Sequence, residues 1–257
     1  MRWMLAIPLI LSAAACDAKP AGNAAEIAAA RAASQPMTLK AADGVTVYGQ
    51  LYKAAKPRAL ILLFHQAGSS KDEYATIAPR LVQAGYSALA IDQRAGDGLY
   101  GKNETADALG HKADYLEARP DLKAALDWGR TQKLPIILWG SSYSSSLIFP
   151  LAAGDPGGIV ALLSFSPGEY FDQDKQMIRA AAAKVNVPVF IASTNSKDET
   201  GEADPIMAAL PKSAKNERYV PDHGVHGSST LIASRNPEGA EANWRAVMTF
   251  LNRVTAK

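Results

Sequence analysis

The chain has 257 residues, of which 48% are hydrophobic and 20% are charged, and its formal net charge is +2. This length allows one large domain or two small ones, with a sizeable buried core. The near-neutral charge balance gives no electrostatic footprint for nucleic acid, and the sequence has no internal repeat and no metal-type cluster of Cys and His. We therefore predict no metal, no cofactor and no nucleic-acid partner.

The first sixteen residues, MRWMLAIPLILSAAAC, form a predicted signal segment. Arg2 precedes an apolar run of about ten residues, which is too short to span a bilayer and is typical of secretory signals. The segment ends at Cys16, the only cysteine of the chain. It resembles a bacterial lipoprotein signal, in which that cysteine is lipidated and Asp17 directs retention at the inner membrane. The resemblance implies a periplasmic protein anchored to the inner membrane through Cys16 alone; ordinary cleavage at an Ala-x-Ala site, such as Ala13 to Ala15, is the alternative.

Residues 17–36 are rich in alanine and predict a tether that ends at Pro36, so the globular domain is expected to span 37–257. Asp43-Gly44 lies between two extended runs and indicates a hairpin. Runs typical of strands then follow at 58–65, 86–92, 135–140, 158–166, 187–193 and 216–222. Helical patterns alternate with them at 72–85, 119–132, 143–154, 174–185, 203–213 and 239–254.

An opening hairpin followed by alternating strands and helices predicts an α/β fold. The sheet should be mostly parallel and doubly wound, with helices on both faces and an antiparallel hairpin at its N-terminal side. In such sheets the functional groups gather in the loops at the carboxyl ends of the strands.

Five serines lie in the stretch SSYSSS, directly after the predicted strand 135–140. A nucleophile on a sharp strand-to-helix turn needs small residues two positions before and after it, because strand and helix approach closely there. Ser142 meets this condition, with Gly140 behind it and Ser144 ahead. Ser141 has the bulky Trp139 behind it, and Ser144 lies too far into the helix. The pattern G-x-S-x-S therefore predicts Ser142 as the nucleophile.

A nucleophilic serine needs a base, and the chain has four histidines. His65 ends the strand 58–65 and is expected to shape the following loop, while His111 lies in a polar stretch and is expected at the surface. His223 and His226 follow the last strand, where the base of a Ser–acid–His chain order belongs. We favour His226, because His-Gly and small residues open the last helical region there, and His223 is the runner-up.

The orienting acid is expected after the strand 187–193, in the segment TNSKDETGEAD. Asp198 is the favoured residue and Glu199 the second choice, and a solvated acidic loop is the alternative. The order supports the assignment, because Ser142, Asp198 and His226 follow three carboxyl-end turns of one predicted sheet.

Six segments together resemble the α/β-hydrolases, close to the small dienelactone-hydrolase-like branch. The segments are ADGVTVYGQLY, LILLFHQAGSSKDEY, YSALAIDQRAGDG, WGSSYSS, PVFIASTNSKDE and DHGVHGSS. The resemblance covers nearly all of 37–257 and implies the α/β-hydrolase fold. Two departures stand out: the loop after His65 reads His-Gln-Ala where many relatives have His-Gly-x, and the elbow has Ser144 in place of its second glycine.

The resemblance implies acyl transfer to water without a metal or cofactor. His226 would take the proton of Ser142 during attack on a carbonyl carbon, and Asp198 would fix the imidazole tautomer. The backbone N–H groups of Ala67 and Tyr143 would form the oxyanion hole.

The short segment after strand 158–166 leaves no room for a large lid, so an open site is expected. Gln66, Tyr170 and Phe171 are candidates for the substrate pocket; the last two residues could equally cover the edge of the core. A small-molecule ester of modest size is the expected substrate, with an amide or a peptide as the alternative on the same residues. The rival from another class is a non-catalytic periplasmic binding module on this fold.

Overall fold

The computed structural model describes residues 24–213 and 215–256 of the chain. The predicted signal segment, Cys16 and the first residues of the predicted tether lie outside this part. Within the described ranges, no helix combines the length and the hydrophobicity that crossing a bilayer requires.

One eight-stranded sheet forms the centre of the structure, in the order β1-β2-β4-β3-β5-β6-β7-β8. The strands are β1 (Gln35–Lys40), β2 (Thr46–Tyr52), β3 (Leu60–Phe64), β4 (Ser87–Ile91), β5 (Ile136–Ser141), β6 (Ile159–Phe165), β7 (Val189–Ala192) and β8 (Glu217–Tyr219). The first two strands pair antiparallel, β2 pairs antiparallel with β4, and every other pair is parallel. The predicted hairpin and the mostly parallel sheet are confirmed.

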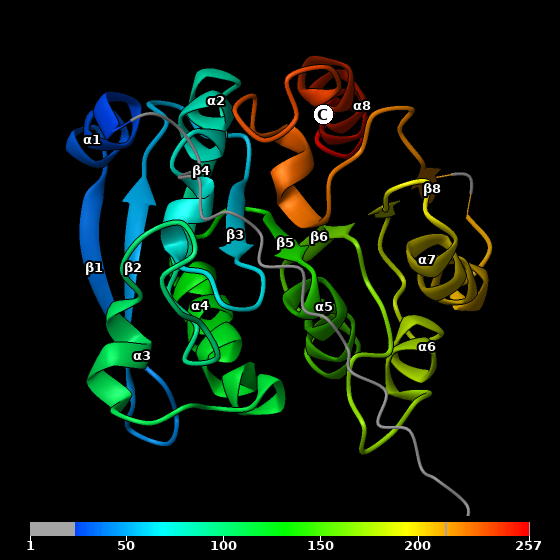
Figure 1. Cartoon of the computed structure of the whole chain (residues 1–257), viewed down its shortest axis with the longest axis horizontal. Coiled ribbons are helices and arrows are strands. Elements are labelled where there is room, and N and C mark those ends of the chain that lie inside the picture. Colours follow the sequence, from blue (N-terminus) through cyan, green and yellow to red (C-terminus); the bar gives the residue numbers. More distant parts are fainter. Residues whose placement is uncertain (1–23, 214, 257) are drawn as a thin grey trace, which may run out of the picture.

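Helices cover both faces of this sheet (Figure 1). The α-helices are α1 (Ala24–Ala32), α2 (Ile77–Gln83), α3 (Glu104–Leu109), α4 (Arg119–Thr131), α5 (Tyr143–Gly154), α6 (Met177–Ala182), α7 (Lys197–Ala209) and α8 (Ala240–Val254). The 3-10 helices are η1 (Lys71–Tyr74), η2 (Tyr115–Ala118) and η3 (Gly227–Leu231). Helices α4 to α7 pack on one face, and α1, α2 and α8 pack on the other.

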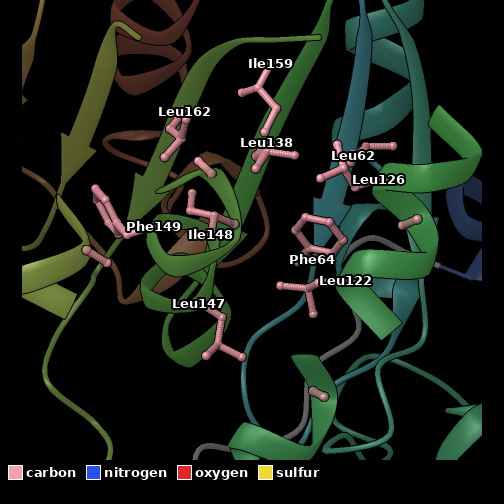
Figure 2. Close-up of a cluster of buried hydrophobic side chains, with 14 of the residues drawn as sticks. Leu62, Phe64, Leu122, Leu126, Leu138, Leu147, Ile148, Phe149, Ile159 and Leu162 are labelled. Carbon is pink, nitrogen blue, oxygen red and sulfur yellow. The ribbon is translucent and has the colours of Figure 1, made fainter. Parts of the chain in front are cut away.

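Strand β3 shows why both faces need a cover, because all five of its residues are buried. Leu62 and Phe64 point into the core below α4 and α5, whereas Ile61 and Leu63 point to the α2 and α8 side. Figure 2 shows the first of these cores, in which Leu62 and Phe64 meet Leu126 of α4 and the side chains of α5. A continuous apolar run is thus split by the pleat into two cores.

The folded unit begins earlier than the predicted boundary at residue 37. Strand β1 pairs with β2 from Gln35 onward, so Met37 lies inside a strand. Helix α1 precedes it, and its Ala30 is buried against the domain. The guanidinium of Arg31 forms an ion pair with Asp72 of η1. The second half of the predicted tether therefore packs against the domain, because burial and an ion pair hold it there.

Two predicted helices have different bounds in the structure. The pattern at 72–85 forms η1 and α2 rather than one helix. The helix expected at 203–213 begins six residues earlier, as α7 at Lys197. No separate lid domain lies between β6 and β7, where 166–188 contains only α6 and connecting segments.

Leu62 of β3 is completely buried between β4 and β5, so its loss should destabilise the fold. Leu62→Ala should lower the free energy of unfolding by about 2–5 kcal/mol, because it removes buried apolar surface and leaves a cavity. Val220→Ala is the control, since this side chain is 43% exposed, and it should change stability by less than about 0.5 kcal/mol. Denaturant unfolding measures both, and equal effects would contradict the core described here.

Candidate active site

The turn between β5 and α5 holds Ser142 in a strained backbone conformation. Its φ of 57° and ψ of −125° lie in a region that residues with a side chain rarely occupy. Strand and helix come so close here that a Cβ on Gly140 would stand 2.4 Å from Cα of Ser145. The packing therefore needs the small residue that the sequence pattern has two positions before Ser142.

Ser144 stands where the second glycine of the elbow pattern is missing. Its buried hydroxyl donates to the carbonyl of Phe64 at 2.7 Å and accepts from the N–H of Ser141 at 2.9 Å. The additional atoms thus serve as a hydrogen-bonded link between α5 and the end of β3. The hydroxyl of Ser141 points into the interior, where it donates to Glu73, so neither neighbour competes with Ser142 as a nucleophile.

His226 lies against Ser142, as the sequence predicted. Its Nε2 is 2.8 Å from Oγ of Ser142, although the two residues are separated by 84 positions in the chain. The imidazole comes from the loop that leads into η3, and its side chain is 42% exposed. Solvent therefore reaches the base directly.

The carboxylate on His226 belongs to Glu199, the second choice of the sequence analysis. Its Oε1 lies 2.8 Å from Nδ1 of His226, and its Oε2 accepts from the N–H of Thr194 at 2.8 Å. Burial alone raises the pKa of Glu199, but the hydrogen bonds to both oxygens and the imidazole outweigh burial and lower the pKa to about 2. Glu199 is therefore ionised at neutral pH.

Asp198 does not make the predicted contact, and the reason is the start of α7. The segment expected to be a loop is the first turn of this helix, where successive side chains point about 100° apart. Glu199 faces His226, and Asp198 faces solvent. Ser196 is the helix N-cap and accepts from the N–H of Glu199. The spacing Ser-x-x-Glu is a helix-start pattern and could have located this turn.

Ser166, at the end of β6, joins the acid to the loop of the base. Its hydroxyl donates to Oε2 of Glu199 at 2.7 Å and accepts from the N–H of Gly227 at 2.9 Å. Its backbone has a φ of 55°, a second strained residue beside the site. Its carbonyl accepts from the phenol of Tyr170 at 2.7 Å. Sequence reasoning missed Ser166, because no local pattern marks it.

His65 shapes the loop after β3 and is completely buried. Its Nδ1–H donates to the carbonyl of Gln66 at 2.7 Å, and its Nε2 accepts from the N–H of Gln93 at 2.9 Å. Burial lowers the pKa of His65 to about 4, so the ring is neutral and its tautomer is fixed by these two partners. The expectation that His65 has a structural role in this loop agrees with these contacts.

The two N–H groups expected to form an oxyanion hole belong to the loop after β3 and to the start of α5. The N–H of Gln66 donates to Glu73 at 2.8 Å, which leaves that of Ala67 as the next donor of the loop. Tyr143 is the first residue of α5, so its N–H has no partner within the helix. The oxyanion hole that the resemblance implies from these two residues stays a prediction.

The three pocket candidates have different places. Tyr170 lies beside the hydroxyl of Ser142 and is half-buried. Phe171 is buried in the core below α5, which is the alternative that the sequence left open. The side chain of Gln66 is 9% exposed and reaches Ser229 in the interior rather than a pocket. Tyr115 stacks on Tyr143 with ring centroids 4.6 Å apart and is 39% exposed.

His223 is separate from the triad. It is exposed and its Nδ1 lies 3.1 Å from Glu238, so His226 alone of the two histidines touches the nucleophile. Within residues 24–213 and 215–256, no group of three or more His, Cys, Asp or Glu side chains could hold a metal ion.

Comparison with solved structures identifies the fold. A dienelactone hydrolase from Anabaena variabilis superposes with a TM-score of 0.67 at 19% identity, covering 86% of this chain and 99% of the other. A carboxyl esterase from Bacillus coagulans gives 0.66 at 13% identity, covering 87% and 99%. An esterase from Pyrococcus furiosus gives 0.62 at 18% identity, covering 87% and 92%. At these identities the likeness establishes the α/β-hydrolase fold.

A comparison with curated proteins found no match to the sequence. A family profile described as serine aminopeptidase, S33, matches residues 55–231, which is more than half of the chain and includes every residue of the Ser142–His226–Glu199 chain of hydrogen bonds. The chain therefore belongs to the serine aminopeptidase S33 family, and it is a serine hydrolase of the α/β-hydrolase fold.

Proposed function

We propose that this protein hydrolyses carboxylic esters of modest size through an acyl-enzyme on Ser142. The observation that carries the proposal is the 2.8 Å contact between Nε2 of His226 and Oγ of Ser142. It is the distance at which a base takes the proton of a hydroxyl. Glu199 holds the other nitrogen of the ring at the same distance, as the orienting acid of a triad does.

The reaction then proceeds in two displacements. Oγ of Ser142 forms a bond to the carbonyl carbon while His226 takes its proton, and the N–H groups of Ala67 and Tyr143 receive the oxyanion. The imidazolium gives this proton to the departing alcohol as the ester bond breaks. A water molecule then attacks the acyl carbon while His226 takes its proton. The imidazolium gives this proton to Oγ of Ser142 as the acyl bond breaks, which releases the acid and restores Ser142. Glu199 stays ionised throughout and stabilises the imidazolium.

Esters of modest size fit the surroundings of Ser142. The segment between β6 and β7 supplies no lid domain, and His226 is open to solvent. Tyr170 is half-buried, and its phenol lies beside the hydroxyl of Ser142. The contacts of His226 with Ser142 and Glu199 also favour catalysis over a pure binding role, because a binding module needs no base beside a serine.

An aminopeptidase is the second candidate, because the description of the matching family names that activity. The same Ser142 and His226 would serve it, and the substrate would be a peptide instead of an ester. The two candidates differ in the leaving group, which is an amine in one case and an alcohol in the other.

Parallel assays of the purified protein separate them. We expect hydrolysis of p-nitrophenyl acetate and butyrate, slower hydrolysis of the laurate ester, and little release from aminoacyl p-nitroanilides. Ser142→Ala should lower kcat on the esters by several orders of magnitude. Ester hydrolysis that is unchanged in Ser142→Ala, or activity on anilides alone, would contradict the proposal.

The acid can be tested with two adjacent carboxylates. Glu199→Gln should lower kcat by about 10³-fold or more, because an amide favours the wrong tautomer of His226 while keeping the shape of the side chain. Asp198→Asn is the matched control and should stay within about threefold of the wild type, since Asp198 faces solvent. Thermal unfolding should show both variants folded. The reverse order of effects would return the role to Asp198.

The base can be tested with the two late histidines. His226→Ala should lower kcat by at least about 10³-fold, because Ser142 loses the group that accepts its proton. His223→Ala removes only a surface contact with Glu238 and should leave kcat nearly unchanged. Steady-state kinetics of both variants on one ester is sufficient, and a large loss in His223→Ala with a small one in His226→Ala would refute the assignment.

A further inference from the structure

Glu73 is a buried carboxylate that takes no part in the mechanism above. It lies in η1, the 3-10 helix that follows the loop after β3, and it is completely buried. Burial raises the pKa of Glu73 to about 7, in spite of hydrogen bonds that lower it. Burying a carboxylate costs free energy of folding unless both of its oxygens accept hydrogen bonds.

One oxygen of Glu73 holds the loop after β3. Its Oε2 accepts from the N–H of Gln66 at 2.8 Å. Gln66 directly precedes Ala67, the first proposed oxyanion donor. Fixing the peptide before Ala67 limits where the N–H of Ala67 can point.

The other oxygen of Glu73 holds the turn of the nucleophile. Its Oε1 accepts from the hydroxyl of Ser141 at 2.7 Å. Ser141 directly precedes Ser142, and the second proposed oxyanion donor, Tyr143, follows. The two oxygens of one carboxylate therefore span the gap between the two halves of the oxyanion hole.

Ser141 extends this connection to the loop of the base. Its Oγ accepts from the N–H of Ser228 at 2.8 Å, two residues after His226. The contact is close, because a Cβ on Gly227 would lie 2.4 Å from Oγ of Ser141. The pair of Glu73 and Ser141 thus touches three loops, which carry the oxyanion donor, the nucleophile and the base.

Such a connection matters because an oxyanion hole works by geometry. Both donors must stand about 2.7–3.1 Å from the developing oxyanion, and a displacement of about 1 Å near a reacting centre can cost about 10²-fold in rate. The two oxygens of a carboxylate have a fixed separation. Glu73 therefore fixes the distance between the loop after β3 and the turn of Ser142, which two unconnected loops would not keep.

We propose that Glu73 is a positioning residue of the hydrolysis, whose carboxylate sets the separation of the two oxyanion donors through Gln66 and Ser141. The inference rests on the proposed esterase function of the same site. It makes a claim that a purely structural role does not: disturbing the pair lowers kcat in molecules that are still folded, and leaves KM nearly unchanged.

Kinetics of four variants on p-nitrophenyl acetate, with thermal unfolding alongside, tests this claim. Glu73→Ala and Ser141→Ala should each lower kcat by about 10- to 100-fold, with KM within about threefold. Glu73→Gln should recover most of the loss, because an amide of the same shape can accept from Gln66 and donate to Ser141. The double variant should be faster than the product of the two single losses predicts, since both single variants lose the same Glu73–Ser141 contact.

Asp72→Asn is the matched control, a neighbouring acid of η1 whose partner is Arg31 on the outside of the domain. It should leave kcat within about twofold of the wild type. Should Glu73→Ala not fold, Ser141→Ala decides, because it removes one oxygen atom and leaves a smaller gap. Wild-type kcat in folded Ser141→Ala, a change in KM alone, or multiplicative losses in the double variant would each overturn the proposal.

Amide hydrogen exchange keeps this inference separate from the esterase proposal. In Ser141→Ala, the N–H of Ser228 loses its acceptor, and exchange there should accelerate by about 10-fold or more, together with exchange in the loop at 65–68. Unchanged exchange in both segments would overturn the connection, even if the wild type is an active esterase. Accelerated exchange in a protein that hydrolyses no ester would refute the proposed function and leave the connection standing.

Discussion

The backbone of Ser142 is the constraint on which the site depends. A backbone φ of 57° costs conformational free energy in a residue with a side chain, so the surrounding contacts must hold it in place. The N–H of Ser142 donates to the carbonyl of Phe165 at 2.8 Å, and its carbonyl accepts from the N–H of Ser145 at 2.9 Å. Close packing at Gly140 fixes the turn from the other side. The result is a hydroxyl that leaves the sheet edge at one defined point, where His226 meets it.

Parallel strand pairing brings the other residues of the site to the same edge of the sheet. Strands β3, β5, β6 and β7 run in the same direction, so the segments after them all leave at their carboxyl ends. Gln66 follows β3, Ser166 follows β6 and Glu199 follows β7 in the first turn of α7. Hydrogen bonds then join these segments to the loop of His226. The helices cover the two faces of the sheet, and the loops at its carboxyl edge contain the residues of the candidate active site.

The sequence revealed the parts of the fold and site that are set by local rules. The alternation of apolar runs and helical patterns predicts the parallel sheet. The small residues two positions before and after Ser142 reflect the close packing of strand and helix at this turn, which is visible in the local sequence. Chain order predicted a base at His223 or His226, and the His-Gly pair followed by small residues favoured His226. The favoured acid, Asp198, was wrong by one position, because the segment is a helix start and not a loop. Neighbouring residues on a helix point in different directions, so Glu199 faces the site and Asp198 faces solvent.

The remaining contacts lie beyond local patterns. Glu73 and Ser141 are 68 residues apart in the chain, and Ser166 and Glu199 are 33 apart. A buried glutamate or a serine at a strand end has no distinctive neighbours in the sequence, and its role depends on which segments the folded sheet brings together. Helix α1 illustrates the same limit, since its docking depends on an ion pair of Arg31 with a residue more than forty positions away.

Covalent labelling of the native protein with a fluorophosphonate tests whether Ser142 is an activated nucleophile. The probe reacts with a serine only where a base takes the proton of its hydroxyl and an oxyanion hole receives the phosphonyl oxygen. Mass spectrometry of the digested protein should find one adduct, on Ser142, and none in heat-unfolded protein. An adduct on Ser141 or Ser144, or no adduct in protein that is demonstrably folded, would contradict the account of this turn as the nucleophile of a hydrolase.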